Sequence, residues 1–442
     1  MKFLLKISIL LFLIPAWPGA LSAQQRILTV DEAIAAAMKN NYDILLLKND
    51  STSYAIDYAY RNAGFLPRVN GTAGWVSNNN NQSQKLSDGT AKKSNGVRSS
   101  NLTASVGLNW TVFDGLKMFA TRDKLGEFVK LGELNIKAQV VTTVAAVVTA
   151  YYNIVSQKQH IHAIEEQMSI NEERVKLADK KFSVGLGAKP ELLQAKVDLN
   201  AQKAARLDEQ ILIAQLKEDL NQLMGAPPDI SYEVTDSIPI DHDLIMEDIR
   251  GYAEKNNPSL LAAKQNITIA NLTLKERKAE LWPTVSLTSA YNFSRTNNNS
   301  VINSFTPLYN QNYGFNYGIT ASIPILNGFN TRREIRQAKL DIVHNTIIFD
   351  NLRAQNDIAI NKSFKSYEYK KATLDLEEEN ILLAKENVSI AVERLRLGVS
   401  TYLELRETQK SLEDAYNRLI TARYDTKVAE IELLRLKGEI VK

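Results

Sequence analysis

The strongest constraint on the fold is that the sequence repeats itself over most of its 442 residues. The clearest matches between the two copies are Lys39-Asn40-Asn41 with Lys255-Asn256-Asn257, Pro67 with Pro283, Gly185 with Gly398 and Gly225 with Gly438. The offset is 216 for the first two pairs and 213 for the last two, so a loop was shortened in between. Each copy is far longer than the roughly 20–50 residues of solenoid repeats. We therefore predict a duplicated unit whose two halves pack together.

Both copies have the same order of predicted elements: an opening helix, two strands, a long helix and a closing helix. In the first repeat, 24–225, these elements are 29–64, 69–77, 101–113, 116–184 and 190–224. In the second repeat, 244–442, they are 244–280, 284–293, 313–323, 329–397 and 402–437. Prolines end the opening helices. We expect 226–243 to be a linker, and the Asn-rich segments 78–100 and 294–312 to be solvated external loops.

The N-terminal segment 1–23 is expected to be a cleaved signal peptide. Lys2 and Lys6 form a basic region before the apolar run 7–14, and Leu21-Ser22-Ala23 offers a small-residue cleavage site. An uncleaved N-terminal anchor is the alternative. The chain has no cysteine, which excludes disulfides and thiolate metal sites. A net charge of +3 and four histidines argue against a nucleic-acid partner and a histidine-rich metal site. Export without cysteine fits a bacterial periplasm or outer membrane.

The predicted strands alternate apolar and polar residues over about ten positions, which is typical of transmembrane barrel strands. In 101–113 the apolar face begins at Leu102 and includes Trp110, while Asn, Thr, Ser and Gly occupy the other face. Strands 284–293 and 313–323 carry Tyr and Phe on their apolar faces. A half-buried strand of a soluble sandwich has the same period and is the alternative interpretation.

The longest elements, 116–184 and 329–397, contain no proline, and each of their 69 residues adds about 1.5 Å to a helix of ~104 Å. Such a helix is much longer than a hydrocarbon core of ~30 Å, so most of it must stand in water. One chain supplies four strands, which cannot close into a barrel alone. Assembly from several chains would solve this, and three chains would give twelve strands. A solid coiled-coil rod is the alternative for the helices.

Paired motifs recur at the junctions and turns of the two repeats. They are Leu66-Pro67 and Trp282-Pro283, Phe113-Asp114-Gly115 and Leu326-Asn327-Gly328, Val184-Gly185-Leu186 with Leu192-Leu193-Gln194-Ala195, and Leu397-Gly398-Val399 with Leu403-Glu404-Leu405. In this set of motifs the sequence resembles the TolC family of outer-membrane channel proteins. The resemblance implies an α+β membrane protein that forms a homotrimer in outer-membrane lipid: an α-barrel of long helices, continuous with a 12-stranded transmembrane β-barrel formed by the trimer. It also implies an exit duct of a tripartite efflux or type I secretion system, fed by an inner-membrane transporter through a periplasmic adaptor.

Two sets of site residues follow from this resemblance. The first is an adaptor-docking edge at the two helix–helix turns, made of Val184, Gly185, Leu186, Leu397, Gly398 and Val399. The second is an acidic ring at the periplasmic entrance, made of Glu404, Glu407 and Glu191. Acids in the first turn of a helix also serve the helix dipole, which is the alternative role. The family has an Arg where this chain has Ser400, which weakens the case for a closing salt bridge there.

An enzymatic function has no support in the motifs. Gly185-Leu186-Gly187 follows a helix and lacks a third glycine, so it is not a dinucleotide fingerprint. Walker, G-x-S-x-G and H-E-x-x-H motifs are absent. We therefore expect no catalytic residue, metal or cofactor. The alternatives to a channel are an exported coiled-coil scaffold or adhesin and an unrecognised periplasmic enzyme.

Overall fold

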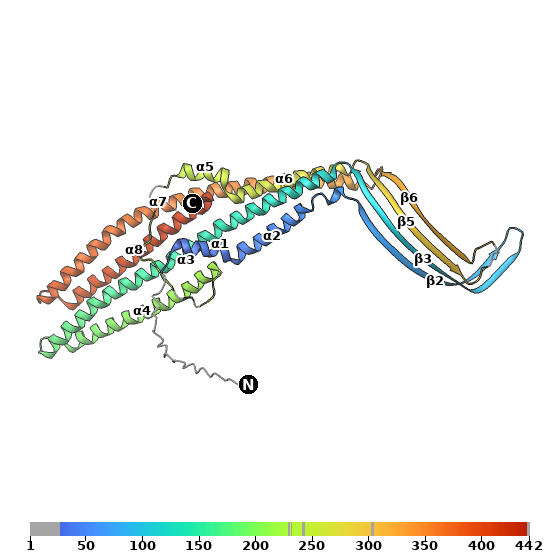
Figure 1. The fold of residues 1–442 in the computed structure, drawn as a ribbon. Helices are drawn as coiled ribbons and strands as arrows, with labels where there is room; N and C mark the ends of the chain where they lie inside the picture. Colours follow the sequence, from blue (N-terminus) through green and yellow to red (C-terminus); the bar gives the residue numbers. More distant parts are fainter. Residues whose placement is uncertain (1–26, 229, 231, 241–243, 302–304, 440–442) are drawn as a thin grey trace, which may run out of the picture.

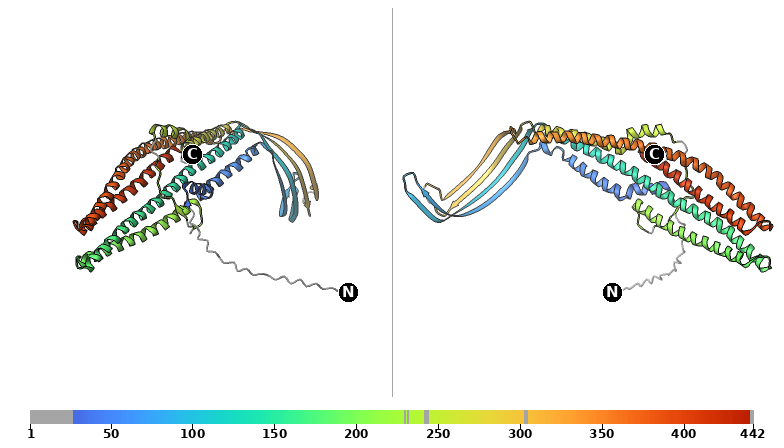
Figure 2. Two further views of the ribbon diagram at one scale, coloured as in Figure 1. Left: turned by 60° about the vertical axis from the view of Figure 1, so that its left-hand side comes forward. Right: turned by 180° about the vertical axis from the view of Figure 1, so that it is seen from behind.

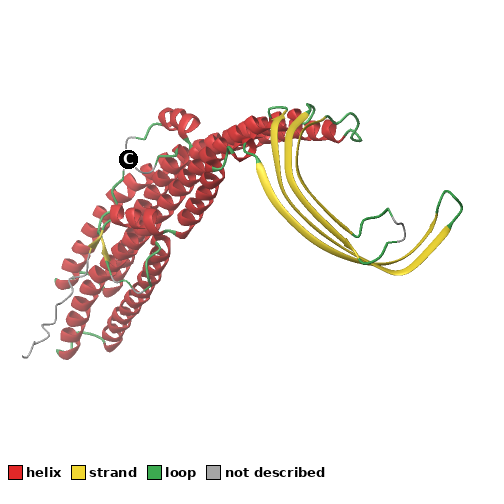
Figure 3. Ribbon diagram, turned by 45° about the vertical axis from the view of Figure 1, so that its right-hand side comes forward, coloured by secondary structure: helices red, strands yellow, loops and turns green. Residues whose placement is uncertain are grey.

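The computed structural model describes residues 27–228, 230, 232–240, 244–301 and 305–439. The expected signal peptide, 1–23, lies outside the described residues. The molecule is elongated, with a bundle of long helices at one end and one curved sheet at the other (Figures 1 and 3). The predicted combination of long helices and strands in two structural repeats is confirmed.

Two pairs of helices form the far end of the bundle (Figure 1). The long helices are α3 (Lys117–Ser183) and α7 (Asn330–Arg396), and the closing helices are α4 (Lys189–Met224) and α8 (Tyr402–Lys437). The sequence predicted these long helices over 116–184 and 329–397, so each observed helix is shorter by one residue at both ends. Each long helix has 67 residues, so it extends about 100 Å. The α3–α4 and α7–α8 hairpins turn at the same end, opposite the sheet (Figure 2).

The opening helix of each repeat is broken in two, where the sequence predicted one continuous helix over 29–64 and 244–280. The helices are α1 (Val30–Asn40) and α2 (Tyr42–Ala59), and α5 (Met246–Asn256) and α6 (Pro258–Ala279). Asn41 has an extended backbone, and its Oδ1 accepts hydrogen bonds from the next helix at 3.0 and 3.3 Å. Asn257 does the same in the second repeat. An Asn side chain competes with the helix for backbone donors, which explains both breaks.

The sheet is antiparallel with strand order β2-β3-β5-β6. Its strands are β2 (Arg68–Lys85), β3 (Ala91–Asp114), β5 (Thr284–Asn298) and β6 (Tyr309–Ser322). The expectation that 78–100 is a loop was wrong, because most of it continues the β2–β3 hairpin, and the loop expected over 294–312 is shortened in the same way. At a bulge, the N–H of Gly96 donates to Asn81 Oδ1 at 2.8 Å. β2 and β3 stay paired past this bulge, beyond the part of the sheet that β5 joins.

The segment between the repeats is part of the core rather than a free linker. Its strand β4 (Glu233–Val234) pairs in parallel with β1 (Ile27–Leu28). Tyr232, Val234 and Ile238 belong to the largest hydrophobic cluster of the described residues, which also contains α3 residues from Val144 to Val155. The burial of its ring raises the pKa of Tyr232. The middle of the molecule is therefore fixed by both repeats and the segment that joins them.

One described helix, α3, is long and apolar enough to cross a membrane, judged by length and composition, and half of its apolar window is buried. No charged residue lies between Lys137 and Lys158. Because Val144, Tyr151 and Val155 of this stretch pack in the central cluster, we interpret it as a core segment.

Candidate functional site

The two helical hairpins end in matching turns, each built around a glycine with positive φ. Gly185 has φ +76° and Gly398 has φ +77°, a conformation that favours glycine. In both turns the residue after the glycine donates its N–H back to the preceding helix, Leu186 to the carbonyl of Lys181 and Val399 to that of Arg394. This is the Schellman pattern of a helix C-terminus. The repeat therefore produces two equivalent tips.

The tips expose apolar side chains. The exposed fractions are 67% for Val184, 82% for Leu186, 77% for Leu397 and 64% for Val399. A Cβ on either Gly185 or Gly398 would have no neighbour within 4 Å, so these turns are open on their outer side. The six residues predicted as a docking edge thus lie together at one end of the molecule, where an apolar partner could cover them.

The three predicted acids have different surroundings. Glu404 is balanced within the chain: its carboxylate lies 3.0 Å from Arg394 Nη1, and Ser400 Oγ donates to it at 2.7 Å. Glu407 is exposed, and no ion pair involves it among the described residues. Glu191 is also exposed, at the start of α4. Burial, and then the nearby Glu191 carboxylate, raise the pKa of Tyr402 on α8. Glu191 therefore lies within electrostatic reach of the second tip.

A buried polar network behind the tips was missed by sequence reasoning. Arg174 is only 5% exposed; it pairs with Asp198 of α4 and donates to Gln409 Oε1 of α8 at 3.0 Å. Gln409 in turn donates to Asn171 Oδ1 at 3.2 Å, and Asn171 to Gln202 Oε1 at 2.6 Å. The network ties the two hairpins together. Its signal in the sequence is a series of polar residues at four- and three-residue spacing on the buried face of α3.

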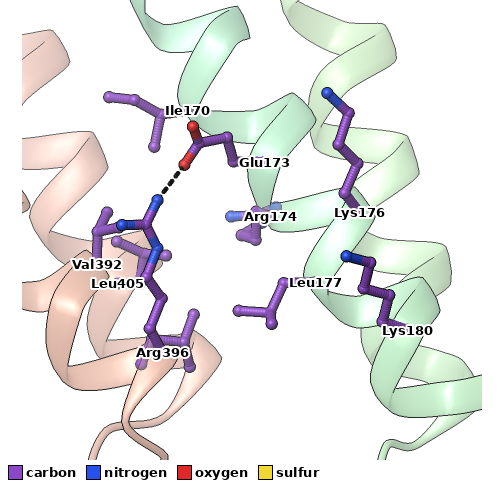
Figure 4. A pocket seen from close by; sticks show the side chains of 10 residues that line it. Ile170, Glu173, Arg174, Lys176, Leu177, Lys180, Val392, Arg396 and Leu405 are labelled. Carbon is purple, nitrogen blue, oxygen red and sulfur yellow. Dashed lines mark hydrogen bonds and ion pairs between the residues drawn. The ribbon is translucent and has the colours of Figure 1, made fainter. Parts of the chain in front are cut away.

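Next to this network lies a groove between α3 and α7, with a volume of about 220 Å³ (Figure 4). Its apolar lining is Ile170, Leu177, Val392, Leu395 and Leu405, and its charged lining is Glu173, Arg174, Lys176, Lys180 and Arg396. Arg396 crosses the groove to Glu173 at 2.8 Å. Both partners are at least half exposed, so this ion pair contributes little to stability. Among the described residues, no group of three or more metal-ligating side chains is found.

A long helical bundle joined to a sheet with an exposed apolar face is the architecture of a membrane channel protein with a helical stalk (Figure 1). The sequence profile of the outer membrane efflux protein family matches residues 22–226 and 250–439. The chain belongs to this family. The resemblance predicted from the sequence is therefore confirmed, and with it the outer membrane as location and an efflux channel as function.

Curated relatives and solved structures agree with this assignment. The chain is 24% identical to the outer membrane efflux protein BepC of Brucella suis, over 76% of this chain and 72% of the relative. It is 20% identical to the probable efflux pump outer membrane protein TtgC of Pseudomonas putida, over 92% and 82%. The CmeC outer membrane channel of Campylobacter jejuni has the same fold, with a TM-score of 0.75 at 16% identity, over 92% and 85%. The alternative of a scaffold or adhesin finds no support in these proteins.

Proposed function

We propose that three copies of this chain form one channel that crosses the outer membrane and continues through the periplasm. The observation that carries the proposal is the sheet, in which β2 and β6 are the two edges and have no outer strand partner in the described part of the chain. Unpaired backbone groups in hydrocarbon cost several kcal/mol each, so strands span membranes only as closed barrels. A single chain leaves two long edges that only another copy can cover.

The strand directions permit this closure. β2 leaves the helices and β6 returns to them, so β6 of one copy would run antiparallel to β2 of the next. Three copies of a four-stranded sheet give twelve strands. A barrel of about eight strands is filled by its own side chains, whereas a larger one leaves room for passage. The polar inner face, rich in Asn, Ser and Thr, suits a water-filled lumen.

The helices support the same assembly. α6 packs against both α3 and α7 of its own chain. α2 packs against α3, and its other flank exposes Leu46, Ile56 and Tyr60. α7 exposes Leu340, Val343 and Ile347 in the half that lies alongside α6. A neighbouring copy would place this face of α7 against α2, as α7 lies against α6 within one chain.

In this proposal the duct is passive and has no catalytic site. The names of BepC and TtgC describe efflux proteins of the outer membrane. By analogy, this chain would receive substrates from an inner-membrane transporter through a periplasmic adaptor that docks on the exposed tips. A type I secretion system would use the same geometry.

The proposal is tested by the mass and conductance of the purified protein. Detergent-extracted protein should have about three times the mass of one chain, and it should form stepwise channels in a planar bilayer. A monomer that produces no conductance would refute the proposed assembly. Replacing Leu186 and Leu397 by Glu should abolish adaptor-dependent efflux in cells while the bilayer conductance stays unchanged. Intact efflux in this double variant would refute docking at the tips.

We also propose that the acidic entrance ring depends chiefly on Glu407 and Glu191, because Glu404 is balanced by Arg394. Three copies would bring six such carboxylates together at the narrow end, which favours cations. Glu407→Gln should lower the cation-to-anion permeability ratio more than Glu404→Gln does. Equal cation-to-anion permeability ratios in the wild type and in Glu407→Gln would refute the proposed acidic ring.

A further inference from the structure

The distal end of the sheet, farthest from the helices, carries a group of cations without matching acids. The cations are Lys85, Lys92, Lys93, Arg98 and Arg295, and all five side chains are exposed. The one acid in this part of the sheet is Asp88, so five positive charges less one negative charge leave +4 per chain. The Asp88 carboxylate is used in its own turn, where it accepts the N–H of Thr90 at 2.9 Å. In the described part of the chain none of the five cations has an ion-pair partner.

The opposite, helix-proximal end of the sheet is different, because cations of the adjoining helices are paired there, and Arg68 is the one unpaired cation among the described strand residues at that end. Lys117 Nζ lies 2.7 Å from Glu280, and Arg277 lies 3.1 Å from Glu280 and 3.2 Å from Glu334. Paired charges of this kind leave no net field for a further anion. The cluster of several unpaired positive charges therefore lies at the distal end of the sheet.

The strand register places most of these cations on the apolar face of the sheet. Arg295 lies directly opposite Leu102, which in turn lies opposite Trp75. Because side chains alternate between the two faces, Arg98 shares the face of Leu102, four residues further out on β3. On β2 the same face continues to Lys85, and the pair Ser83–Lys93 belongs to it. Lys92 pairs with Gln84 and lies on the other face.

The height of the apolar face fixes where these cations would lie relative to a bilayer. The face runs on β3 from Leu102 to Val112, and its exposed aromatic residues include Trp75, Tyr291 and Phe315. Ten steps of about 3.4 Å, tilted by ~40°, give a band of roughly 26 Å, which matches the ~25 Å band of membrane barrels. Arg295 then lies at the upper rim of the band, and Arg98 about 13 Å further along the strand.

We propose that Arg98 and Arg295 bind the phosphate groups of anionic lipids in the outer leaflet, with Lys85 and Lys93 as outlying positive charges on the same face; the four are here called the rim cations. The proposal rests on the proposed function, since it requires the sheet to stand in the membrane. Lipid phosphates lie just outside the hydrocarbon layer, at the level of Arg295 and Arg98. Lys85 and Lys93 lie nine or more residues beyond the level of Arg295 along the hairpin, on the same face, and add positive charge farther from the membrane. Guanidinium groups bind phosphate through two parallel hydrogen bonds, and lysines add point charge. Neighbouring Asn and Ser side chains add neutral donors and no competing carboxylate.

Lipid binding is tested on the full-length assembled protein in neutral detergent micelles. The probe is lipid A, a lipid with two phosphate monoesters, and inorganic phosphate is the free-anion control. We expect the wild type to bind lipid A at least tenfold more tightly than a variant in which all four rim cations are changed to Gln. Raising the salt concentration should weaken wild-type binding and leave the residual binding of the variant unchanged.

Two single variants make the test specific to the face. Lys92→Gln removes one cation from the same hairpin but from the opposite face, and it should keep wild-type affinity. Arg295→Gln should weaken binding severalfold, and Arg295→Lys should recover part of the loss. Equal affinity of the wild type and the fourfold variant, or equal binding of inorganic phosphate, would overturn the proposal. Conductance of the same samples separates the two claims, since a conducting trimer that ignores lipid A refutes only the lipid site.

Discussion

The opening helices of the two repeats, α2 and α6, come from matching sequence but have different surroundings. α6 has nine buried residues and packs against α3 and α7. α2 has one buried residue, Ile44, whose counterpart in α6 is Leu260. Beyond this shared first turn the positions diverge: Leu46 is 63% exposed, whereas its counterpart Ala262 is 8% exposed. The difference fits the proposed assembly, in which another copy of the chain would cover the exposed side of α2.

The largest expected effect comes from placing a charge at this matched pair of positions. Leu46→Glu should leave the helical content of the chain unchanged and abolish the trimer, because the charge would be buried only after assembly. Ala262→Glu should prevent folding of the chain itself, since the site is already buried between helices. Circular dichroism measures the helical content of each variant, and the mass of the detergent complex shows whether the trimer forms. A trimeric Leu46→Glu variant would show that α2 is not at an interface.

The glycines that end the closing helices sharpen the comparison. A Cβ on Gly225 would come within 2.4 Å of the Asn40 carbonyl oxygen, whereas one on Gly438 would meet the Asn257 Cα at 3.0 Å. Both glycines have positive φ, which alone costs an alanine about 1–2 kcal/mol. We expect Gly225→Ala to lose about 3–4 kcal/mol of unfolding free energy and Gly438→Ala about 2, from the added steric overlap. Denaturant unfolding in detergent gives both values, and equal losses would contradict the predicted order.

A buried carboxylate joins α6 to α3, and α2 has no equivalent. Glu276 is 7% exposed. Its carboxylate forms an ion pair with Lys124 and accepts a hydrogen bond from Thr121 Oγ1 at 2.6 Å. Its counterpart in the first repeat is Tyr60, which is 72% exposed. Glu276→Gln should cost about 2 kcal/mol of unfolding free energy, because it leaves the partly buried Lys124 without a counter-charge. Tyr60→Gln, the matched control, should change chain stability by less than about 0.5 kcal/mol.

The smallest expected effect concerns the two asparagine joints, where the repeats are alike. Asn41 Nδ2 donates to the Leu223 carbonyl and Asn257 Nδ2 to the Leu436 carbonyl, both at 2.9 Å. Each Asn also caps the following helix. Either Asn→Ala change should lower the unfolding free energy by about 1–2 kcal/mol. Losses that differ by more than 1 kcal/mol between the two variants would show that the joints are not equivalent.

Regular elements could be predicted from the sequence because their signals are local. The long helix expected over 116–184 is observed as Lys117–Ser183, and Gly115 with positive φ explains where it begins. The Asn41 break and the continued β2–β3 hairpin were missed. The break arises because the Asn41 side chain caps the next helix. The hairpin continues because its polar Asn and Ser residues carry no alternation but still pair through their main chain.

The candidate site could be predicted only in part. The two tips could be predicted because Gly185 and Gly398 each provide the positive φ that a tight turn after a helix favours. The pairing of Glu404 with Arg394 depends on how the chain folds back through the turn, and the contact of Arg174 with Gln409 joins helices 235 positions apart. Contacts of that separation leave no mark in one sequence except polar residues on a buried face.

The central claim, closure of the sheet between copies, is tested most directly by disulfide formation between β2 and β6. The chain has no cysteine, so Val69→Cys can be combined in turn with Cys at Ile319, Thr320, Ala321 or Ser322. Within one chain β2 and β6 are three strand spacings apart, about 14 Å, which is too far for a disulfide. The account predicts that at least one pair forms linked dimers and trimers and nothing larger. No linkage in any pair, or a ladder that extends beyond three chains, would contradict it.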